Sequence, residues 1–71
     1  MFDELKLKAT LTMKRKTVGD LANAIGVSKP TLYRKFRGQS DFTRNEIALI
    51  AQVLNLSAVE VNDIFFGKKV S

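Results

Sequence analysis

The chain contains no cysteine, no histidine and no tryptophan. Without cysteine it can form no disulfide framework, and without thiolate or imidazole ligands the usual zinc sites are excluded. Catalysis that depends on a cysteine nucleophile or a histidine base is excluded for the same reason. The acids Asp20, Glu46, Glu60 and Asp63 fall at helix caps or on the predicted surface, and no glycine-rich phosphate loop is present. We therefore expect no enzyme, no metal, no cofactor and no small-molecule substrate.

Long hydrophobic runs are also missing. No apolar stretch approaches the about 20 residues that a membrane-spanning helix needs. The first residues, Met-Phe-Asp-Glu, are acidic where a signal peptide is basic. No low-complexity tract, repeat or linker divides the chain, so residues 1–71 are expected to form one domain. These features predict an intracellular protein without a membrane partner.

Acidic residues are scarce in one half of the chain. Residues 5–37 hold nine basic side chains against the single acid Asp20, a net charge of +8. Residues 38–66 hold one basic side chain, Arg44, against four acids, although the whole chain carries +5. Basic residues that serve only solubility are expected to mix more evenly with acids, so this segregation favours a polyanionic partner. A basic surface that serves solubility alone is the alternative.

Helical signals cover the chain, whereas no alternating β-branched run is bounded by hairpin turns. Three capping-box patterns and one serine before Lys-Pro mark helix starts, at Thr17, Ser28, Thr43 and Ser57. Three glycines that follow apolar periodic segments mark helix ends, at positions 26, 38 and 67. The sequence therefore predicts a compact all-α fold of five helices, over residues 3–14, 18–25, 29–37, 44–54 and 58–66.

Apolar residues recur at helical spacing in all five segments and predict the core. The predicted core consists of Leu7, Leu11, Leu21, Ala22, Ile25, Leu32, Phe36, Ile47, Ile50, Ala51, Leu54, Val61, Ile64 and Phe65. Val27 and Leu56 are expected to fill connecting turns. Burying one large aliphatic side chain contributes about 1.5–3 kcal/mol, which is enough for a dozen of them to order a small helical bundle.

Residues 17–38 predict two short helices joined by a tight turn at Gly26, the second of them basic. A helix pair of this kind can lay its second helix in the major groove of double-stranded DNA. If Leu32 and Phe36 point inward, four residues near the start of this helix point outward: Lys29, Pro30, Thr31 and Arg34. We expect these four to contact bases, with Arg34 donating two hydrogen bonds to guanine. A solvated surface arginine is the alternative for Arg34.

Residues around this helix are expected to contact phosphates, which set register rather than sequence choice. They are Thr17, Ser28, Tyr33, Lys35, Arg37, Gln39, Ser40, Arg44 and Asn45. Thr17 precedes a helix whose free N–H groups and dipole favour an anion. Tyr33 can alternatively close the core as a half-buried aromatic ring. The basic run Lys14-Arg15-Lys16 fits a solvated helix end better than a DNA contact.

The pattern T-x-x-x-L-A-x-x-I-G-V-S-x-x-T-L-x-x-x-x-x-G over residues 17–38 resembles the Cro/phage-repressor type of helix-turn-helix regulator. The segment A-V-E-V-N-D-I-F-F over residues 58–66 is similar to small prophage regulators of that family. The resemblance implies a five-helix, lambda repressor-like DNA-binding domain in a transcriptional regulator. It also implies a dimer on a two-fold operator, in the cytoplasm of a bacterial or phage-infected bacterial cell.

Two positions depart from the family pattern. The family often has a phosphate-contacting glutamine immediately after the residue that matches Thr17, where this chain has Val18. Many members also pair a buried arginine with a glutamate at the positions that match Leu11 and Phe36, which we expect to pack together instead. Replacing a buried ion pair by apolar residues is often neutral or stabilising, so the fold is expected to survive.

One module burying about 600–1,000 Å² seldom supplies enough affinity and specificity alone. We therefore expect a homodimer, at least on DNA, built by the C-terminal helix and tail, residues 57–71. Its candidate surface consists of Val59, Phe66 and Val70, although Phe66 can equally belong to the core. The competing function is that of an antirepressor or antitoxin-like module that binds another phage regulator, which the small size and Val18 favour.

Overall fold

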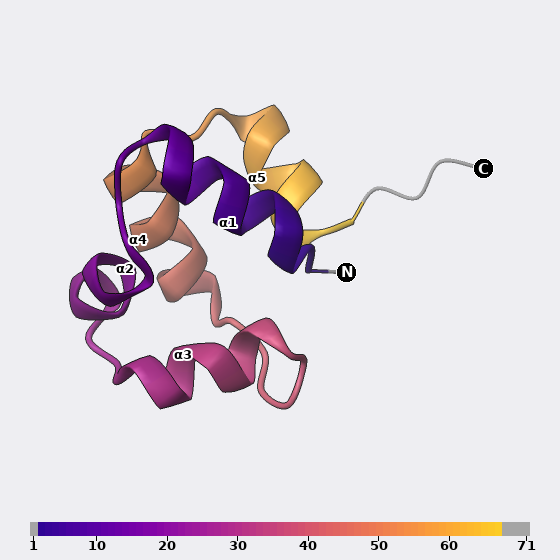
Figure 1. Ribbon diagram of the computed structural model, residues 1–71. Helices are drawn as coiled ribbons and strands as arrows, with labels where there is room; N and C mark the ends of the chain where they lie inside the picture. Colours follow the sequence, from indigo (N-terminus) through magenta and orange to yellow (C-terminus); the bar gives the residue numbers. More distant parts are fainter. Residues whose placement is uncertain (1, 68–71) are drawn as a thin grey trace.

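The computed structural model describes residues 2–67, which contain five α-helices and no strand (Figure 1). The helices are α1 Glu4–Met13, α2 Val18–Ile25, α3 Lys29–Phe36, α4 Arg44–Leu54 and α5 Ala58–Phe65. This confirms the predicted all-α fold of five helices. Helices α1, α3 and α5 are shorter than predicted, because the residues expected at their ends act as caps instead. None of the described helices is long and apolar enough to cross a membrane.

Local hydrogen bonds set where the helices begin. The Thr17 hydroxyl accepts from the Asp20 N–H at 3.0 Å, and the Asp20 carboxylate accepts from the Thr17 N–H at 2.9 Å. The same reciprocal capping box opens α4 and α5, as predicted from their Thr/Ser-x-x-Glu patterns. These bonds satisfy N–H groups that have no partner within the helix, so each start is fixed by its own sequence.

The turn between α2 and α3 depends on Gly26, whose φ of 76° lies in the left-handed region. This conformation lets the Val27 N–H donate to the Ala22 carbonyl at 3.0 Å, which closes the end of α2. No atom lies within 4 Å of a Cβ built on Gly26, so the need for glycine here is one of backbone conformation alone. The predicted tight turn is confirmed.

The core runs through all five helices. Its buried hydrophobic residues are Leu7, Leu11, Leu21, Ala22, Ile25, Leu32, Phe36, Ile50, Leu54, Ile64 and Phe65, each of them predicted. Ile47, Ala51 and Val61 are partly buried, which is less than predicted. Leu11 and Phe36 both lie in this core, as expected for the apolar replacement of a charged pair.

The helices leave α3 at one edge of the bundle. Helix α2 packs against α4 and α3, and α5 packs against α1 and α4. The Asp3 N–H donates to the Ile64 carbonyl at 2.7 Å, and the Lys6 ammonium lies 3.5 Å from the Asp63 carboxylate, which joins α1 to α5. In Figure 1, α3 runs along the bottom of the molecule with its lower side away from every other helix. One whole side of α3 is therefore accessible.

An aromatic cluster joins the end of α3 to α5. The ring centroid of Phe2 lies 5.6 Å from that of Phe36, 4.9 Å from that of Phe42 and 5.5 Å from that of Phe65. Such pairs contribute about 0.5–1.5 kcal/mol each beyond the area that they bury. No periodic pattern predicts Phe2 or Phe42, because both lie outside the helices.

Candidate nucleic-acid interface

Three of the four residues predicted to contact bases lie on the accessible side of α3, and the fourth, Lys29, is its first residue. Lys29, Pro30 and Arg34 are exposed and Thr31 is half-buried, whereas Leu32 and Phe36 are buried. For Pro30, Thr31 and Arg34 this division follows from the about 100° rotation between successive helical residues, whereas Lys29 is exposed at the start of the helix. All four residues lie on α3, and this helix runs along the edge of the molecule (Figure 1).

A chain of hydrogen bonds links three residues on this side. The Ser28 hydroxyl caps α3 by accepting from the Thr31 N–H at 3.3 Å, and it donates to the Thr31 hydroxyl at 3.0 Å. The guanidinium of Arg34 donates to the same Thr31 oxygen at 3.4 Å. Thr31 therefore accepts two hydrogen bonds and holds Arg34 beside it. What Thr31 can offer to a base edge is its own hydroxyl hydrogen.

Lys29 lies across the first turn of the neighbouring helix. A Cβ built on Gly19 of α2 stands 3.2 Å from Cε of Lys29 and 3.6 Å from Oγ1 of Thr17. Two predicted contacts from different helices, Lys29 and Thr17, are thereby brought together. Gly19 leaves room for the lysine stem, a role that no local sequence pattern reveals.

Thr17 already serves α2 as its N-cap. Hydrogen bonds from the Thr17 backbone N–H and hydroxyl, the former the stronger, lower the pKa of the Asp20 carboxyl below its usual 3.8. The carboxylate of Asp20 thus already occupies the positive end of α2, where it competes with a phosphate. The exposed ammonium of Lys29 near this turn supplies a charge of the opposite sign.

Two basic side chains lie close to the ring of Tyr33. The half-buried ring packs edge-on against Phe36, with the two ring centroids 5.7 Å apart. The Arg37 guanidinium lies 5.5 Å and the Lys8 ammonium 5.7 Å from its centroid. Lys8, which also pairs with Glu4 at 3.0 Å, is an addition to the basic surface. No sequence pattern predicts it here, because α1 and α3 meet only in the folded chain.

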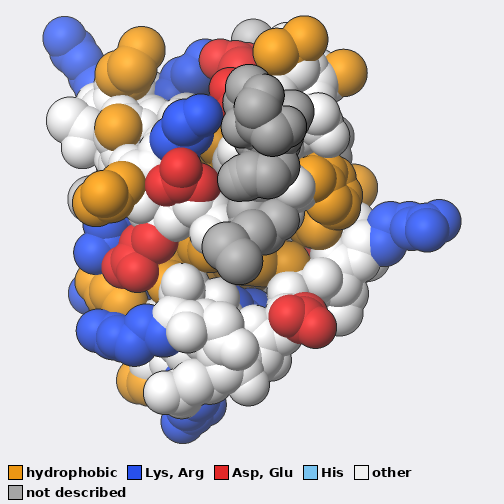
Figure 2. Space-filling model, turned by 90° about the vertical axis from the view of Figure 1, so that its right-hand side faces the viewer, with side chains coloured by type: hydrophobic (Ala, Val, Ile, Leu, Met, Phe, Trp, Pro, Cys, Tyr) orange, Lys and Arg blue, Asp and Glu red, His pale blue; other side chains and the backbone are white. Residues whose placement is uncertain are grey.

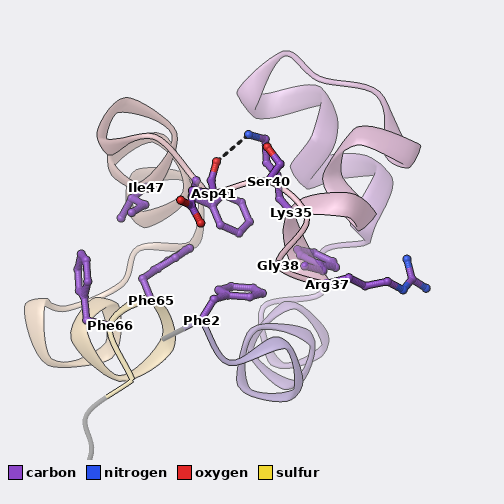
Figure 3. Close-up of a pocket in the computed structure, with 11 residues that line it drawn as sticks. Phe2, Lys35, Arg37, Gly38, Ser40, Asp41, Ile47, Phe65 and Phe66 are labelled. Atoms are coloured by element: carbon purple, nitrogen blue, oxygen red, sulfur yellow. Dashed lines mark hydrogen bonds between the residues drawn. The ribbon is translucent and has the colours of Figure 1, made fainter.

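Lys35 is the exception among the predicted phosphate contacts. It is buried, with 8% of its surface exposed, and its ammonium donates to the Asp41 carbonyl at 3.0 Å (Figure 3). The same ammonium pairs with the Glu46 carboxylate at 3.1 Å. The prediction that Lys35 contacts a phosphate is therefore wrong. Its position on the helix suggests a free cation, but α4 and the preceding loop cover it.

The remaining predicted phosphate contacts lie on an exposed surface beside α3. These residues are Arg37, Gln39, Ser40, Arg44 and Asn45. The Gln39 N–H donates to the Arg34 carbonyl at 3.0 Å and the Gly38 N–H to the Lys35 carbonyl at 3.2 Å, which folds the loop back onto α3. The φ of 81° at Gly38 permits this reversal. The structure thus places the loop and the start of α4 next to the end of α3.

Apolar side chains are exposed on a different part of the molecule. Val59 is 73% and Phe66 is 56% exposed, so Phe66 does not belong to the core. Val70 lies outside the described residues. Phe66 borders a groove of ≈ 630 Å³ whose apolar lining comes from Phe2, Phe36, Phe42, Ile47 and Phe65 (Figure 3). The face in Figure 2 carries hydrophobic side chains interspersed with both basic and acidic ones.

Comparison with known proteins agrees with this arrangement. Residues 7–61 match the profile of a family described as helix-turn-helix, HTH_3. The matched range contains α2, α3 and α4 entirely. A comparison with curated proteins gave no match.

Proposed function

The chain belongs to the Cro/XRE-type helix-turn-helix family of DNA-binding transcription regulators, and we propose that it acts as a Cro-like or phage-repressor-like regulator with α3 in the major groove. The observation that carries this proposal is the linked set Ser28, Thr31 and Arg34 on the accessible side of α3. A guanidinium held beside the helix is ready to donate two parallel hydrogen bonds to guanine O6 and N7. Lys29 and Pro30 complete the base-reading side.

Residues near both ends of α3 are proposed to contact the phosphates beside the bases that α3 contacts. We assign them to Thr17, Ser28, Tyr33, Arg37, Gln39, Ser40, Arg44 and Asn45, and we omit Lys35 because it is buried. Each phosphate neutralised by a cation makes the slope of log affinity against log salt concentration more negative by about 0.9. Arg37 and Arg44 are therefore expected to contribute to the salt dependence, whereas the neutral residues set register.

We further propose that two copies bind a two-fold operator through Val59 and Phe66. Both side chains are largely exposed although they are apolar. A dimer doubles the base contacts of one short helix and requires half-sites about one helical turn, or 34–36 Å, apart.

Selection of bound sites from a random pool of double-stranded DNA tests both proposals. The expected result is an enriched motif with two-fold symmetry. Arg34→Ala should weaken binding by about 1–3 kcal/mol and relax preference at one base pair per half-site. Lys6→Ala is a matched control, since Lys6 lies on α1 and pairs with Asp63 on α5. An enriched motif without symmetry contradicts the dimer, and no enrichment at low salt contradicts base reading.

The groove beside Phe66 favours a second candidate, in which the protein binds another regulator. Val18, partly buried against the core, offers no polar group where the family often has its phosphate-contacting glutamine. If the pure protein shows no sequence preference at low salt, this antirepressor-like function takes precedence. A Phe66→Ala variant that no longer binds the other regulator then supports it.

A further inference from the structure

We propose that Lys35 is a positioning residue, which holds the loop 37–43 and the first turn of α4 against α3 so that their exposed residues can meet the DNA backbone. This inference rests on the proposed DNA-binding function. Lys35 itself touches no DNA, because its ammonium is enclosed by protein.

The ammonium of Lys35 joins three parts of the chain. Lys35 lies in the last turn of α3, its first partner is the Asp41 carbonyl in the loop, and its second is the Glu46 carboxylate in the first turn of α4. Only 9% of the Lys35 side chain and 15% of the Glu46 side chain are exposed. The loop residue Phe42 lies beside them, with its ring centroid 5.9 Å from the ammonium.

The ion pair also shares an atom with the cap of α4. Oε1 of Glu46 accepts from the Lys35 ammonium at 3.1 Å and from the Thr43 N–H at 2.9 Å. The Thr43 hydroxyl in turn accepts from the Glu46 N–H at 3.1 Å. Arg44 and Asn45, the first two residues of α4, lie between these two capping residues. Lys35 therefore acts on the helix start that carries two of the proposed phosphate contacts.

The middle of the loop depends on the same lysine. The turn at Gly38 and Gln39 is held by backbone hydrogen bonds to α3, and Thr43 is held by Glu46. Within the described residues, the bond from Lys35 to the Asp41 carbonyl is the hydrogen bond that ties segment 40–42 to α3. Figure 3 shows this bond crossing from α3 to the loop above the groove.

A charged residue at this place is better explained by geometry than by stability. A buried ion pair often adds little net stability compared with apolar residues of the same size, because both charges lose their hydration. Its hydrogen bonds, however, specify one arrangement of the three segments, which apolar contacts do not. The exposed side chain of Arg34 hydrogen-bonds to Thr31 on α3 itself, so we expect its DNA contact not to depend on this arrangement.

The first test needs no DNA. Backbone ¹⁵N order parameters are measured for residues 39–43 in the wild type, in Lys35→Met and in Lys35→Arg. We expect Lys35→Met to lower them from about 0.85 to below about 0.6, and Lys35→Arg to keep them near the wild-type value. If Lys35 only adds stability, its replacement by methionine lowers the thermal midpoint but leaves the order parameters of the folded protein unchanged. That result overturns the proposal. If Lys35→Met does not fold, Glu46→Gln is measured instead, with the same expectation and the same contradicting result.

The second test uses the selected operator and double-mutant cycles. Lys35→Met should bind about tenfold more weakly, and Arg44→Ala should add little in that background. Arg34→Ala should keep its full effect, which makes it the matched control. If the effects of Lys35→Met and Arg44→Ala on binding add fully, Lys35 does not position Arg44 and the proposal is contradicted. If the wild type shows no sequence preference, the proposed function fails, while the order parameters still decide whether Lys35 holds the loop.

Discussion

Lys29 and Gly19 are neighbours across the helix-turn-helix, with the lysine Cε 3.2 Å from where a Cβ on Gly19 would stand. The contact places Lys29, a proposed base contact of α3, over the first turn of α2. Because 3.2 Å is closer than ordinary van der Waals contact, any side chain at position 19 must displace the lysine.

A Gly19→Ala variant should separate stability from binding. Alanine suits a helix better than glycine, so the free energy of unfolding should rise by about 0.4–1 kcal/mol, since the far end of Lys29 can move aside. Binding to the operator should weaken because Lys29 is displaced. Thermal unfolding and operator titration measure the two effects. Ala24→Gly, at an exposed position of α2, is the control for helix propensity. Unchanged affinity in Gly19→Ala contradicts a role for the observed Lys29 position.

Gly26→Ala should destabilise the protein by about 1–2 kcal/mol, because a Cβ disfavours the left-handed backbone at φ 76°. Gly26→Asn should cost less, since asparagine tolerates this region better and no atom within 4 Å opposes the Cβ. Denaturant unfolding of the two variants measures the difference. Equal losses in Ala and Asn variants would show that conformation is not the cause.

Because of Glu46, the free energy of unfolding should fall as the pH drops below the usual pKa of a glutamate, 4.5. Burial raises the pKa of Glu46, but the hydrogen bond from the Thr43 N–H and the Lys35 ammonium together outweigh it, so the pKa lies below 4.5. A lowered folded-state pKa contributes stability that is present above pH 4.5 and is lost as the pH falls through the folded-state value.

Glu46→Gln should therefore flatten the acid limb of the stability curve and cost about 1–3 kcal/mol at pH 7, where it leaves a buried ammonium without its charged partner. Glu60→Gln is the matched control. Hydrogen bonds from Ser57 lower the pKa of Glu60, and the lysine that also lowers it, Lys14, is only partly buried. Urea unfolding from pH 3 to pH 7 checks this expectation. If Glu46→Gln leaves the loss of stability at acid pH unchanged, that loss is caused by other carboxylates.

Phe66→Ser should weaken dimerisation on the operator, since the 56% exposed ring is proposed to be covered by the second copy. The expected readout is a loss of cooperativity in operator titrations, with half-site binding unchanged. Leu5→Ser is the control, because Leu5 is 79% exposed on α1 and is not part of the proposed dimer surface. A Phe66→Ser protein that still binds cooperatively rules out this interface.

Local features of the fold were predictable because their causes are local. Each capping box needs a hydroxyl and an acid three residues apart, and each buried stripe needs apolar residues on successive turns. The turn at Gly26 likewise follows from one residue that reaches the left-handed region. All eleven hydrophobic residues that are buried within residues 2–67 come from the predicted core for this reason.

The outward side of α3 follows from the same periodicity, because burying Leu32 and Phe36 obliges Pro30 and Arg34 to face outward. Phe2 and Phe42 were not predicted to join the core because they lie outside any periodic segment. Both rings are partly buried, and they can pack together only after α3, the loop and α5 have met.

Local sequence patterns suffice to predict the five helices, their caps, the apolar stripes and the surplus of positive charge around the second and third helices. Tertiary structure alone decided which cations are free. Lys35 and Arg34 are adjacent in sequence, yet one is buried against Glu46 and the other is exposed, because the loop 37–43 and the first turn of α4 lie against the side of α3 that carries Lys35. Likewise Lys8 meets Tyr33, and Lys29 meets Gly19, only where two helices pack. Contacts between helices depend on packing angles that no single segment encodes.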